Sequence, residues 1–470
     1  MRQGEHIGTV VAGNGPFALL PLHASIVGLV LLMAFATVMS QTHLLVSAHG
    51  AVAVSSGVAV MVLIAYMRYG LGFPWLSAVV VYLLLFWMFH FGMAFTGVLA
   101  PWALDELHSA DVNWLFLPNA RVAMLIAVIG AAGFAATAGL FAPRAHAETS
   151  HHGGSRTVYV AGWLLMLTGM TGAVIFLFLA GGLGIFSMGY MELRVGVLGT
   201  TYTSLAIDMS QLGCVFAVCG GANVRQSVAP VAVWSLLGLL VVSLGLRTEA
   251  LVPLVTYALL LAHRGIHLPR AAVITAVIVA LFAIPAIRTV RLVGISNWSA
   301  ADWTSASPLG TFTELGGTLR ATKAYVDWID EGDDYLLGGT YWAPFDRQLV
   351  TRLIAGRRIV PREDDPRIPT RFISGVGAVG LSAVGEAYYN FGPAGPLMYC
   401  AALGLLFGWL ERRAPLTPYH GALLGIASIV LFFNIRGDWL AVPARIGMAA
   451  SLLFACYAFE RFTQRTEAWS

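Results

Sequence analysis

Charge is what this sequence lacks most: only 11% of its 470 residues are Asp, Glu, Lys or Arg, whereas 58% are hydrophobic. A soluble globular protein carries about 25% charged residues, so this chain lacks the polar surface that water requires. The formal net charge of +3 is also too small to indicate a nucleic-acid partner. The composition therefore predicts a protein that is embedded in a lipid bilayer.

Cysteine and the motifs of soluble enzymes are scarce as well. The four cysteines all lie within hydrophobic segments, where single cysteines act as small packing residues, so no disulfide framework is expected. There is no Walker P-loop, no H-E-x-x-H, no C-x-x-C and no G-x-S-x-G. These absences argue against an ATP-driven pump and against a zinc protease. We expect neither a metal nor an organic cofactor.

The hydrophobic residues occur in blocks of about 20, the length that crosses the core of a bilayer as a helix. Backbone polar groups in lipid are satisfied only in helices or closed barrels, and the alternating segments of a barrel are absent. The sequence therefore predicts an all-α polytopic membrane protein with about 12 transmembrane helices. The predicted spans are residues 17–39, 44–66, 74–100, 121–141, 157–180, 204–221, 228–246, 248–262, 271–287, 393–410, 419–435 and 440–459. The span at 204–221 carries Asp208 and Gln211, and the span at 248–262 is short, so either is also compatible with a re-entrant helix.

The arginines of the short loops predict the orientation, because Lys and Arg collect on the cytoplasmic side of a membrane. With the N-terminus in the cytoplasm, the acidic residues Asp105, Glu106 and Asp111 fall outside. The arginines that then fall inside are Arg68, Arg144, Arg156, Arg225, Arg264, Arg270, Arg412, Arg413, Arg461 and Arg465. We therefore expect both termini in the cytoplasm.

One connection is far longer than the usual loop. The predicted division is spans 1–9 at residues 1–287, a large extracytoplasmic loop at 288–391, and spans 10–12 with a short cytoplasmic tail at 392–470. Within the loop, residues 314–330 and 346–359 carry apolar residues at helical spacing. The second stretch is also basic, which is typical of a helix in the headgroup layer. A solvated helix packed on the rest of the loop fits it equally well.

Arginines also occur where the predicted helices reach the outer face. Arg194 lies in an outer loop, Arg247 begins a span, and Arg436 lies in the last outer turn. Arg288 and Arg291 are three residues apart and share a helical face. Ionisable residues at membrane depth are costly and are therefore functional candidates, and a guanidinium binds phosphate with a planar fork of donors. We interpret the set as a site for a pyrophosphate headgroup, whereas for any single arginine snorkelling or pairing with an acid is the alternative.

Glu386 stands out among the acidic residues because it follows a glycine-rich run and precedes an apolar helix. A carboxyl at the membrane boundary can have a raised pKa and act as a general base. It can equally be the salt-bridge partner of one of the arginines. The acidic pairs at 333–334 and 364–365 are read as solvated turns rather than as divalent-cation sites.

Three stretches carry a resemblance to a known family. They are Gly-Leu-Arg-Thr-Glu at 245–249, Tyr-Leu-Leu-Gly-Gly-Thr-Tyr-Trp at 335–342, and Gly-Glu-Ala-Tyr-Tyr-Asn-Phe-Gly-Pro-Ala-Gly at 385–395. The last stretch is the most specific, and together they cover the second half of the chain. In these features the sequence resembles the bacterial O-antigen and capsule polysaccharide polymerases of the Wzy type.

The resemblance implies a membrane glycosyltransferase of the GT-C type in the bacterial inner membrane. Such an enzyme transfers a growing glycan from undecaprenyl pyrophosphate to an incoming lipid-linked repeat unit at the outer face. The implied partners are the lipid-linked oligosaccharide and membrane lipids, and a chain-length regulator is a possible further partner. Relatives that use polyprenyl monophosphate sugars often carry an acidic residue in the first outer loop, which here is only Gln-Thr-His at 41–43. Asp105 and Glu106 in the second outer loop are the alternative.

The hypothesis assigns a role to each candidate residue. Arg247, Arg288 and Arg291 neutralise the charge that builds on the pyrophosphate leaving group. Glu386 orients or deprotonates the acceptor hydroxyl. The residues assigned to substrate binding are Arg194, Arg436 and Asn390, together with the aromatic side chains Tyr388, Tyr389, Trp303, Tyr341 and Trp342, which offer flat surfaces for sugar rings. Anchoring at the membrane interface is the alternative for the aromatic residues.

Two rival functions remain open at this point. An O-antigen-ligase-like transferase, which passes a finished glycan to another acceptor, would share the outer arginines and the long loop. A flippase or transporter is the rival from a different class. Many transporters contain paired repeats with broken helices, and this sequence shows no such two-fold pattern.

Overall fold

The computed structural model describes residues 47–99, 112–142, 153–186, 201–266, 268–293, 308–354 and 381–467, besides a few isolated positions. Within these ranges every regular element is a helix. Nine of the described helices are long and apolar enough to cross a membrane, and α18 (Pro418–Asn434) is a shorter apolar helix. The predicted all-α polytopic fold is confirmed. The first predicted span, at 17–39, lies almost entirely outside the described residues.

Most helices follow one another through short turns. In chain order they are α2 (Ser47–Ala65) continued by η1 (Tyr66–Gly70), α3 (Ala78–Leu99), η2 (Asn113–Phe116), α6 (Pro118–Ala138), η3 (Gly139–Phe141), α7 (Arg156–Gly181), η4 (Gly182–Phe186), α9 (Thr201–Gly220), α10 (Val224–Ser243), α11 (Arg247–His263), α12 (Arg270–Val293), α13 (Pro308–Leu315), α14 (Thr318–Asp330), α15 (Gly339–Phe345), η8 (Asp346–Ile354), α16 (Ala383–Phe391), α17 (Ala394–Arg413), η11 (Ala414–Leu416), α18 and α19 (Val442–Glu467). The two segments that were also compatible with re-entrant helices, α9 and α11, are continuous helices of 20 and 17 residues.

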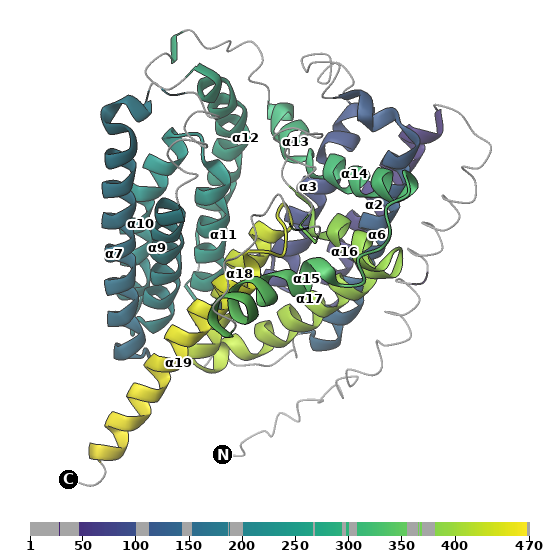
Figure 1. Ribbon diagram of the computed structural model, residues 1–470. Helices are drawn as coiled ribbons and strands as arrows, with labels where there is room; N and C mark the ends of the chain where they lie inside the picture. Colours follow the sequence, from purple (N-terminus) through teal and green to yellow (C-terminus); the bar gives the residue numbers. More distant parts are fainter. Residues whose placement is uncertain are drawn as a thin grey trace, which may run out of the picture.

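The long helices form two groups that α18 joins (Figure 1). α7, α9, α10 and α11 pack together in one group, and α2, α3, α6 and α17 in the other. α18 contacts α9 and α11 on one side and α3 and α17 on the other. Of the helices of the long loop, α13 packs on α3, α14 packs on α6, and α16 packs on α14 and α17. We call the region where these loop helices pack the loop end, and the predicted orientation makes the end of α12 that leads into it the outer one.

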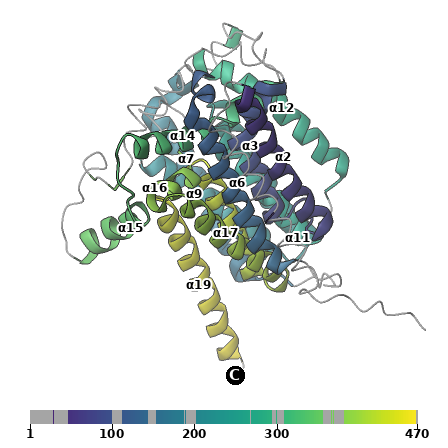
Figure 2. The same cartoon turned by 90° about the vertical axis from the view of Figure 1, so that its right-hand side faces the viewer.

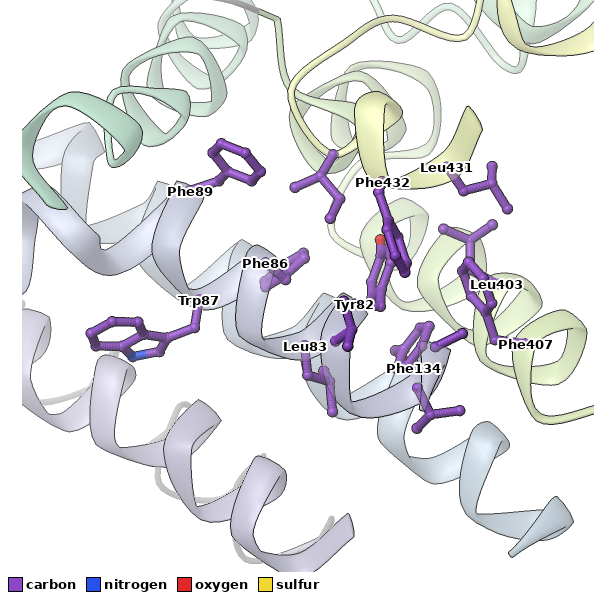
Figure 3. Packing of buried hydrophobic residues seen from close by; sticks show 14 of the residues in the cluster. Tyr82, Leu83, Phe86, Trp87, Phe89, Phe134, Leu403, Phe407, Leu431 and Phe432 are labelled. Carbon is purple, nitrogen blue, oxygen red and sulfur yellow. The ribbon is translucent and has the colours of Figure 1, made fainter. Parts of the chain in front are cut away.

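Aromatic side chains fill the contact between α3, α6, α17 and α18 (Figure 3). Tyr82 stacks on Phe134 with 4.4 Å between the ring centroids, and Phe407 stacks on Phe432 at 5.7 Å. Lipid tails are as apolar as these side chains, so exclusion of water does not hold the helices together. Close fit and dispersion forces between the rings supply the attraction instead.

Small residues bring α7 and α9 into close contact. Gly162 on α7 faces Gly213 on α9, Gly169 on α7 faces Ser210, and Gly220 on α9 faces the start of α7. At each of these four glycines a Cβ atom would overlap the backbone of the other helix. Such small-residue faces are a common way for helices to associate in a membrane, where backbones must approach closely to gain van der Waals contact.

Large apolar side chains cover much of the outside of the bundle. Leu239 on α10 and Phe454 on α19 are 69% and 70% exposed. Soluble monomers rarely expose contiguous apolar patches of more than a few hundred Å². The surface of these helices therefore faces lipid, and the chain is an integral membrane protein.

The long loop differs in detail from its predicted helices. The stretch at 314–330 is broken at Gly316 and Gly317 into α13 and α14, and Gly316 lies so close to the backbone of Met93 on α3 that no Cβ would fit. The start of the stretch at 346–359 is the π-helix η8, which continues α15. Figure 2 shows this pair standing out from the bundle at one side. Residues 355–360 lie outside the described part of the chain.

Candidate functional site

Helix α16 carries the most specific motif, and its glycines explain how the helix is placed. Gly385 lies so close to Thr322 and Tyr325 of α14 that a side chain would not fit there. The hydroxyl of Ser382 caps the helix by accepting a hydrogen bond from the Gly385 N–H at 3.2 Å. Gly392 has a φ of +61°, which allows the chain to reverse directly into α17. The motif therefore packs α16 on α14 at the loop end of the spans.

Glu386 is a buried carboxyl, and no described residue serves as its cationic partner. It is 2% exposed, and its Oε2 accepts a hydrogen bond from the Trp439 backbone N–H at 2.8 Å. Burial and the nearby charge of Asp438 raise the pKa of Glu386 to about 8, although hydrogen bonds from Thr340 and Trp439 oppose this rise. Within the described residues no arginine forms an ion pair with Glu386. Of the predicted arginines, Arg247 and Arg436 are described with their side chains, and neither forms the predicted salt bridge with Glu386.

The turn between α18 and α19, residues 435–441, closes over Glu386. Asn434 holds this turn, because its Nδ2 donates to the Asp438 carbonyl at 2.8 Å while its Oδ1 accepts from the Tyr399 hydroxyl. The Trp439 ring packs edge-on against Tyr399, with 6.1 Å between the centroids. Arg436 lies on the same turn, so one predicted substrate-binding residue shares a seven-residue segment with the backbone partner of Glu386.

Two of the three matching stretches meet at Asn390. Its Nδ2 donates to the Thr340 hydroxyl at 2.7 Å and to the Glu386 carbonyl at 2.8 Å. The backbone N–H groups of Leu336 and Leu337 donate to the carbonyls of Tyr389 and Asn390 at 3.1 and 2.9 Å. These hydrogen bonds hold the segment at 335–342 against the end of α16, and Asn390 contributes both its side chain and its carbonyl to them.

Tyr388 and Tyr389 are both buried. The Tyr389 hydroxyl donates to Asp333 Oδ2 at 2.8 Å, and its ring packs against Tyr325 and Trp328 of α14. The Tyr388 ring lies edge-on to Tyr335, with 6.0 Å between the centroids. Neither ring presents an open face to a sugar. In this structure both rings pack α16 against neighbouring parts of the long loop.

Tyr341 and Trp342 lie instead in an open groove beside Glu386. The Tyr341 ring stacks between Phe391 and Tyr399 at 6.1 and 6.0 Å. Its hydroxyl is buried, and it finds no partner within the described part of the chain. We call this groove of about 500 Å³ the aromatic groove, and its lining is Gly338, Tyr341, Trp342, Phe345, Phe391, Gly395, Met398, Tyr399 and Trp439.

Arg247 lies in a different place and has its own partners. It is buried; its Nη2 donates to Glu314 of α13, and its Nη1 donates to the Ile284 carbonyl of α12 at 3.2 Å. Both terminal nitrogens therefore bond to groups of the protein. This arrangement matches the alternative given for a single arginine, pairing with an acidic residue. Arg288 and Arg291 lie on α12, but their side chains are outside the described part. Arg194 and Trp303 lie outside the described residues altogether.

Several residues of the site were not predicted as such: Thr340, Tyr399, Asn434 and Trp439. Thr340 lies within a matching stretch, whereas the other three stand in apolar helices or turns with no local signal. Among the described residues, no group of three or more His, Cys, Asp or Glu side chains is placed to hold a metal ion.

Comparison with known proteins agrees with the motifs. The model of the family described as O-antigen polysaccharide polymerase Wzy matches residues 23–463. Protein CapE of Staphylococcus aureus is 26% identical over 377 residues, which cover 78% of this chain and 81% of CapE. No solved structure matches the chain. Because the match spans nearly the whole sequence, the resemblance in the motifs is confirmed, and the chain belongs to the O-antigen polysaccharide polymerase Wzy family.

Proposed function

We propose that this membrane protein polymerises undecaprenyl-pyrophosphate-linked oligosaccharide repeat units at the outer face of the bacterial inner membrane. The observation that carries the proposal is Glu386. Its carboxyl is buried at the loop end without a cationic partner among the described residues, bonded to a turn that carries an arginine and close to an open groove. Membership of the family supports glycan polymerisation as the reaction.

In the proposed reaction Glu386 is the general base. Its carboxylate takes the proton of the acceptor hydroxyl while that oxygen bonds to the anomeric carbon of the growing chain. The bond from this carbon to the pyrophosphate oxygen breaks, and the electron pair leaves with undecaprenyl pyrophosphate. A base is most effective when its pKa lies near the working pH, and a pKa of about 8 meets that condition.

The α18–α19 turn must move before the acceptor can reach Glu386, because the carboxyl is shut off from solvent in this structure. The turn is bonded to Glu386 through the Trp439 N–H. We assign this movement to substrate binding, which would exchange the Trp439 contact for the acceptor hydroxyl. Arg436 lies on the moving turn and would meet the pyrophosphate as the turn opens.

The other predicted arginines take different parts in this proposal. Arg288 and Arg291 lie near the end of α12 and remain the proposed pyrophosphate contacts together with Arg436, while Arg194 remains a proposed substrate contact. Arg247 does not contact the substrate in this proposal. Its pair with Glu314 instead fixes the start of α11 against α13. Asn390 likewise holds α16 in place.

The test is polymerisation by the purified full-length protein in nanodiscs, supplied with the lipid-pyrophosphate repeat unit of its native host. We expect a ladder of products from the wild type and none from Glu386→Gln. Glu331→Gln is the matched control, because it removes an exposed carboxyl from the same loop and should leave the ladder intact. A well-folded wild type that makes no ladder, or transfers its glycan only to a second acceptor, would overturn the proposal.

A further inference from the structure

The aromatic groove is notable for the polar groups that it lacks. Of its nine lining residues, four carry a side-chain nitrogen or oxygen, one atom each on an aromatic ring: Tyr341, Trp342, Tyr399 and Trp439. The Tyr399 hydroxyl is already bonded to Asn434, and the Tyr341 hydroxyl is buried. A sugar in this groove would leave most of its hydroxyls without hydrogen-bond partners, which costs free energy for each one. The lining therefore selects an apolar occupant, although its aromatic rings first indicated a sugar platform.

The rim of the groove is apolar too, so the groove opens toward lipid. Trp342 and Met398 are 59% and 58% exposed, and Leu337, the neighbour in the chain of the lining residue Gly338, is 80% exposed. Leu337 also has a φ of +46°, a conformation that is unfavourable for a residue with a side chain. Large exposed apolar side chains at the end of a membrane span are typical of contact with the boundary layer of the bilayer.

The groove and Glu386 share a wall. Trp439 contributes its ring to the groove and its backbone N–H to Glu386. The Tyr341 ring lies edge-on to the Trp439 ring, with 5.6 Å between the centroids, and lines the groove beside it. An elongated apolar chain in the groove would therefore reach Trp439, the residue that bonds to Glu386. The same turn carries Arg436.

We propose that the aromatic groove binds the first isoprene units of the substrate's polyprenyl tail and so sets the position of the pyrophosphate relative to Glu386. This inference rests on the proposed function and names the part of the substrate that this site takes. A volume of about 500 Å³ is within the usual range of small-molecule sites, which are mostly apolar with a few polar groups.

Photo-crosslinking of the full-length protein in nanodiscs tests the proposal, with two probes made from the native repeat unit. One probe carries a diazirine in the first isoprene units, and the other carries it on the terminal sugar. We expect the tail probe to label Trp342, Met398 or Tyr399, and unlabelled substrate to compete with it. The sugar probe should label outside the groove. Labelling of the groove by the sugar probe instead of the tail probe would overturn the inference.

A variant that fills the groove gives an independent readout. Met398→Trp should raise the KM for the lipid-linked repeat unit about tenfold, equivalent to roughly two lost methylene contacts, and should reduce tail-probe labelling. Leu405→Trp is the matched control, because it lies two turns further along the same face of α17 and outside the groove. An unchanged KM in Met398→Trp would count against the groove. Absence of any polymer from the wild type would count against the proposed function alone, since labelling does not require turnover.

Discussion

Two carboxyl groups near the loop end, the partly buried Glu314 and the buried Glu386, have opposite surroundings. Glu314 faces Arg247, whose guanidinium donates to Oε1, so the two charges cancel within the pair. Among the described residues, Glu386 faces two uncharged donors, the Trp439 N–H and the Thr340 hydroxyl, and a second acid, Asp438, lies nearby. A carboxylate that is paired with an arginine is stabilised in its charged form and is held in position by that arginine. A carboxyl that is buried without a cation keeps a proton that it can exchange near neutral pH.

The two groups also differ in what they connect. The Arg247–Glu314 pair joins α11 to α13, and α13 in turn packs on α3 of the other helix group. Glu386 joins α16 to a turn of seven residues. We infer that the arginine pair is part of the frame that holds the two groups of helices together, whereas the Glu386 contact is the one that opens during the reaction.

The largest effect is expected from Glu386→Gln. The amide can still accept a hydrogen bond from the Trp439 N–H, so the fold should persist, but it cannot take a proton from the acceptor. General base catalysis contributes about 10²–10⁴-fold, and the rate of polymerisation should fall by that factor. The measurement is the initial rate in nanodiscs, together with the thermal unfolding midpoint. A variant with normal stability and more than half of the wild-type rate would contradict the role of Glu386.

The next effect concerns stability at the arginine pair. Arg247→Ala leaves Glu314, whose side chain is only 11% exposed, without its partner. Loss of one partner typically costs about 3–5 kcal/mol in a fully buried pair and less in this partly buried one, so the unfolding midpoint in detergent should fall clearly. In the double variant Arg247→Ala/Glu314→Ala no charge is stranded, and most of the lost stability should return. If the single and double variants unfold at the same temperature, the pair is not a structural unit.

A smaller effect is expected from pH. The ionised fraction of Glu386 should grow as pH rises toward its pKa of about 8, so the rate should increase up to about tenfold per pH unit below that value and level off above it. The stability should change in the opposite direction. The pKa in the folded state lies above the ordinary glutamate value, so the folded protein loses stability as pH rises from about 4.5 through about 8. Unfolding midpoints of the wild type against pH should show this loss, and those of Glu386→Gln should lack it.

The smallest effect is expected from Tyr389→Phe. The variant removes the hydrogen bond to Asp333 and keeps the ring in its packed position between Tyr325 and Trp328. A single hydrogen bond contributes about 1 kcal/mol, so the unfolding midpoint should fall slightly and the rate of polymerisation should stay within about twofold. A large loss of rate at normal stability would show that Tyr389 contacts the substrate.

The sequence predicts the spans well because the bilayer imposes their length. The predicted span at 228–246 corresponds to α10 at 224–243, and the one at 440–459 to α19, which starts at Val442 and extends further to Glu467. The α16 motif was also found from the sequence, since its glycines and Glu386 lie within a few residues of one another. Both are features that are local in the chain.

What could not be predicted is set by contacts between distant residues. Arg247 was expected to be available for phosphate, but its partner Glu314 stands 67 residues later. Trp439, which bonds to Glu386, is 53 residues away, in a turn without a local signal. Tyr341 was predicted as a sugar platform from its ring, whereas the scarcity of polar atoms around it appears only when α15, α16, α17 and the α18–α19 turn come together.

The central claim is that Glu386 belongs to the reaction and Arg247 to the frame. The most direct test is single-turnover glycosyl transfer by purified Glu386→Gln and by Arg247→Ala/Glu314→Ala, each first shown to be folded. The account predicts that the double variant transfers the glycan at a rate near that of the wild type and that Glu386→Gln does not transfer it measurably. A folded double variant that is inactive, beside an active Glu386→Gln, would contradict the account and place Arg247 on the pyrophosphate.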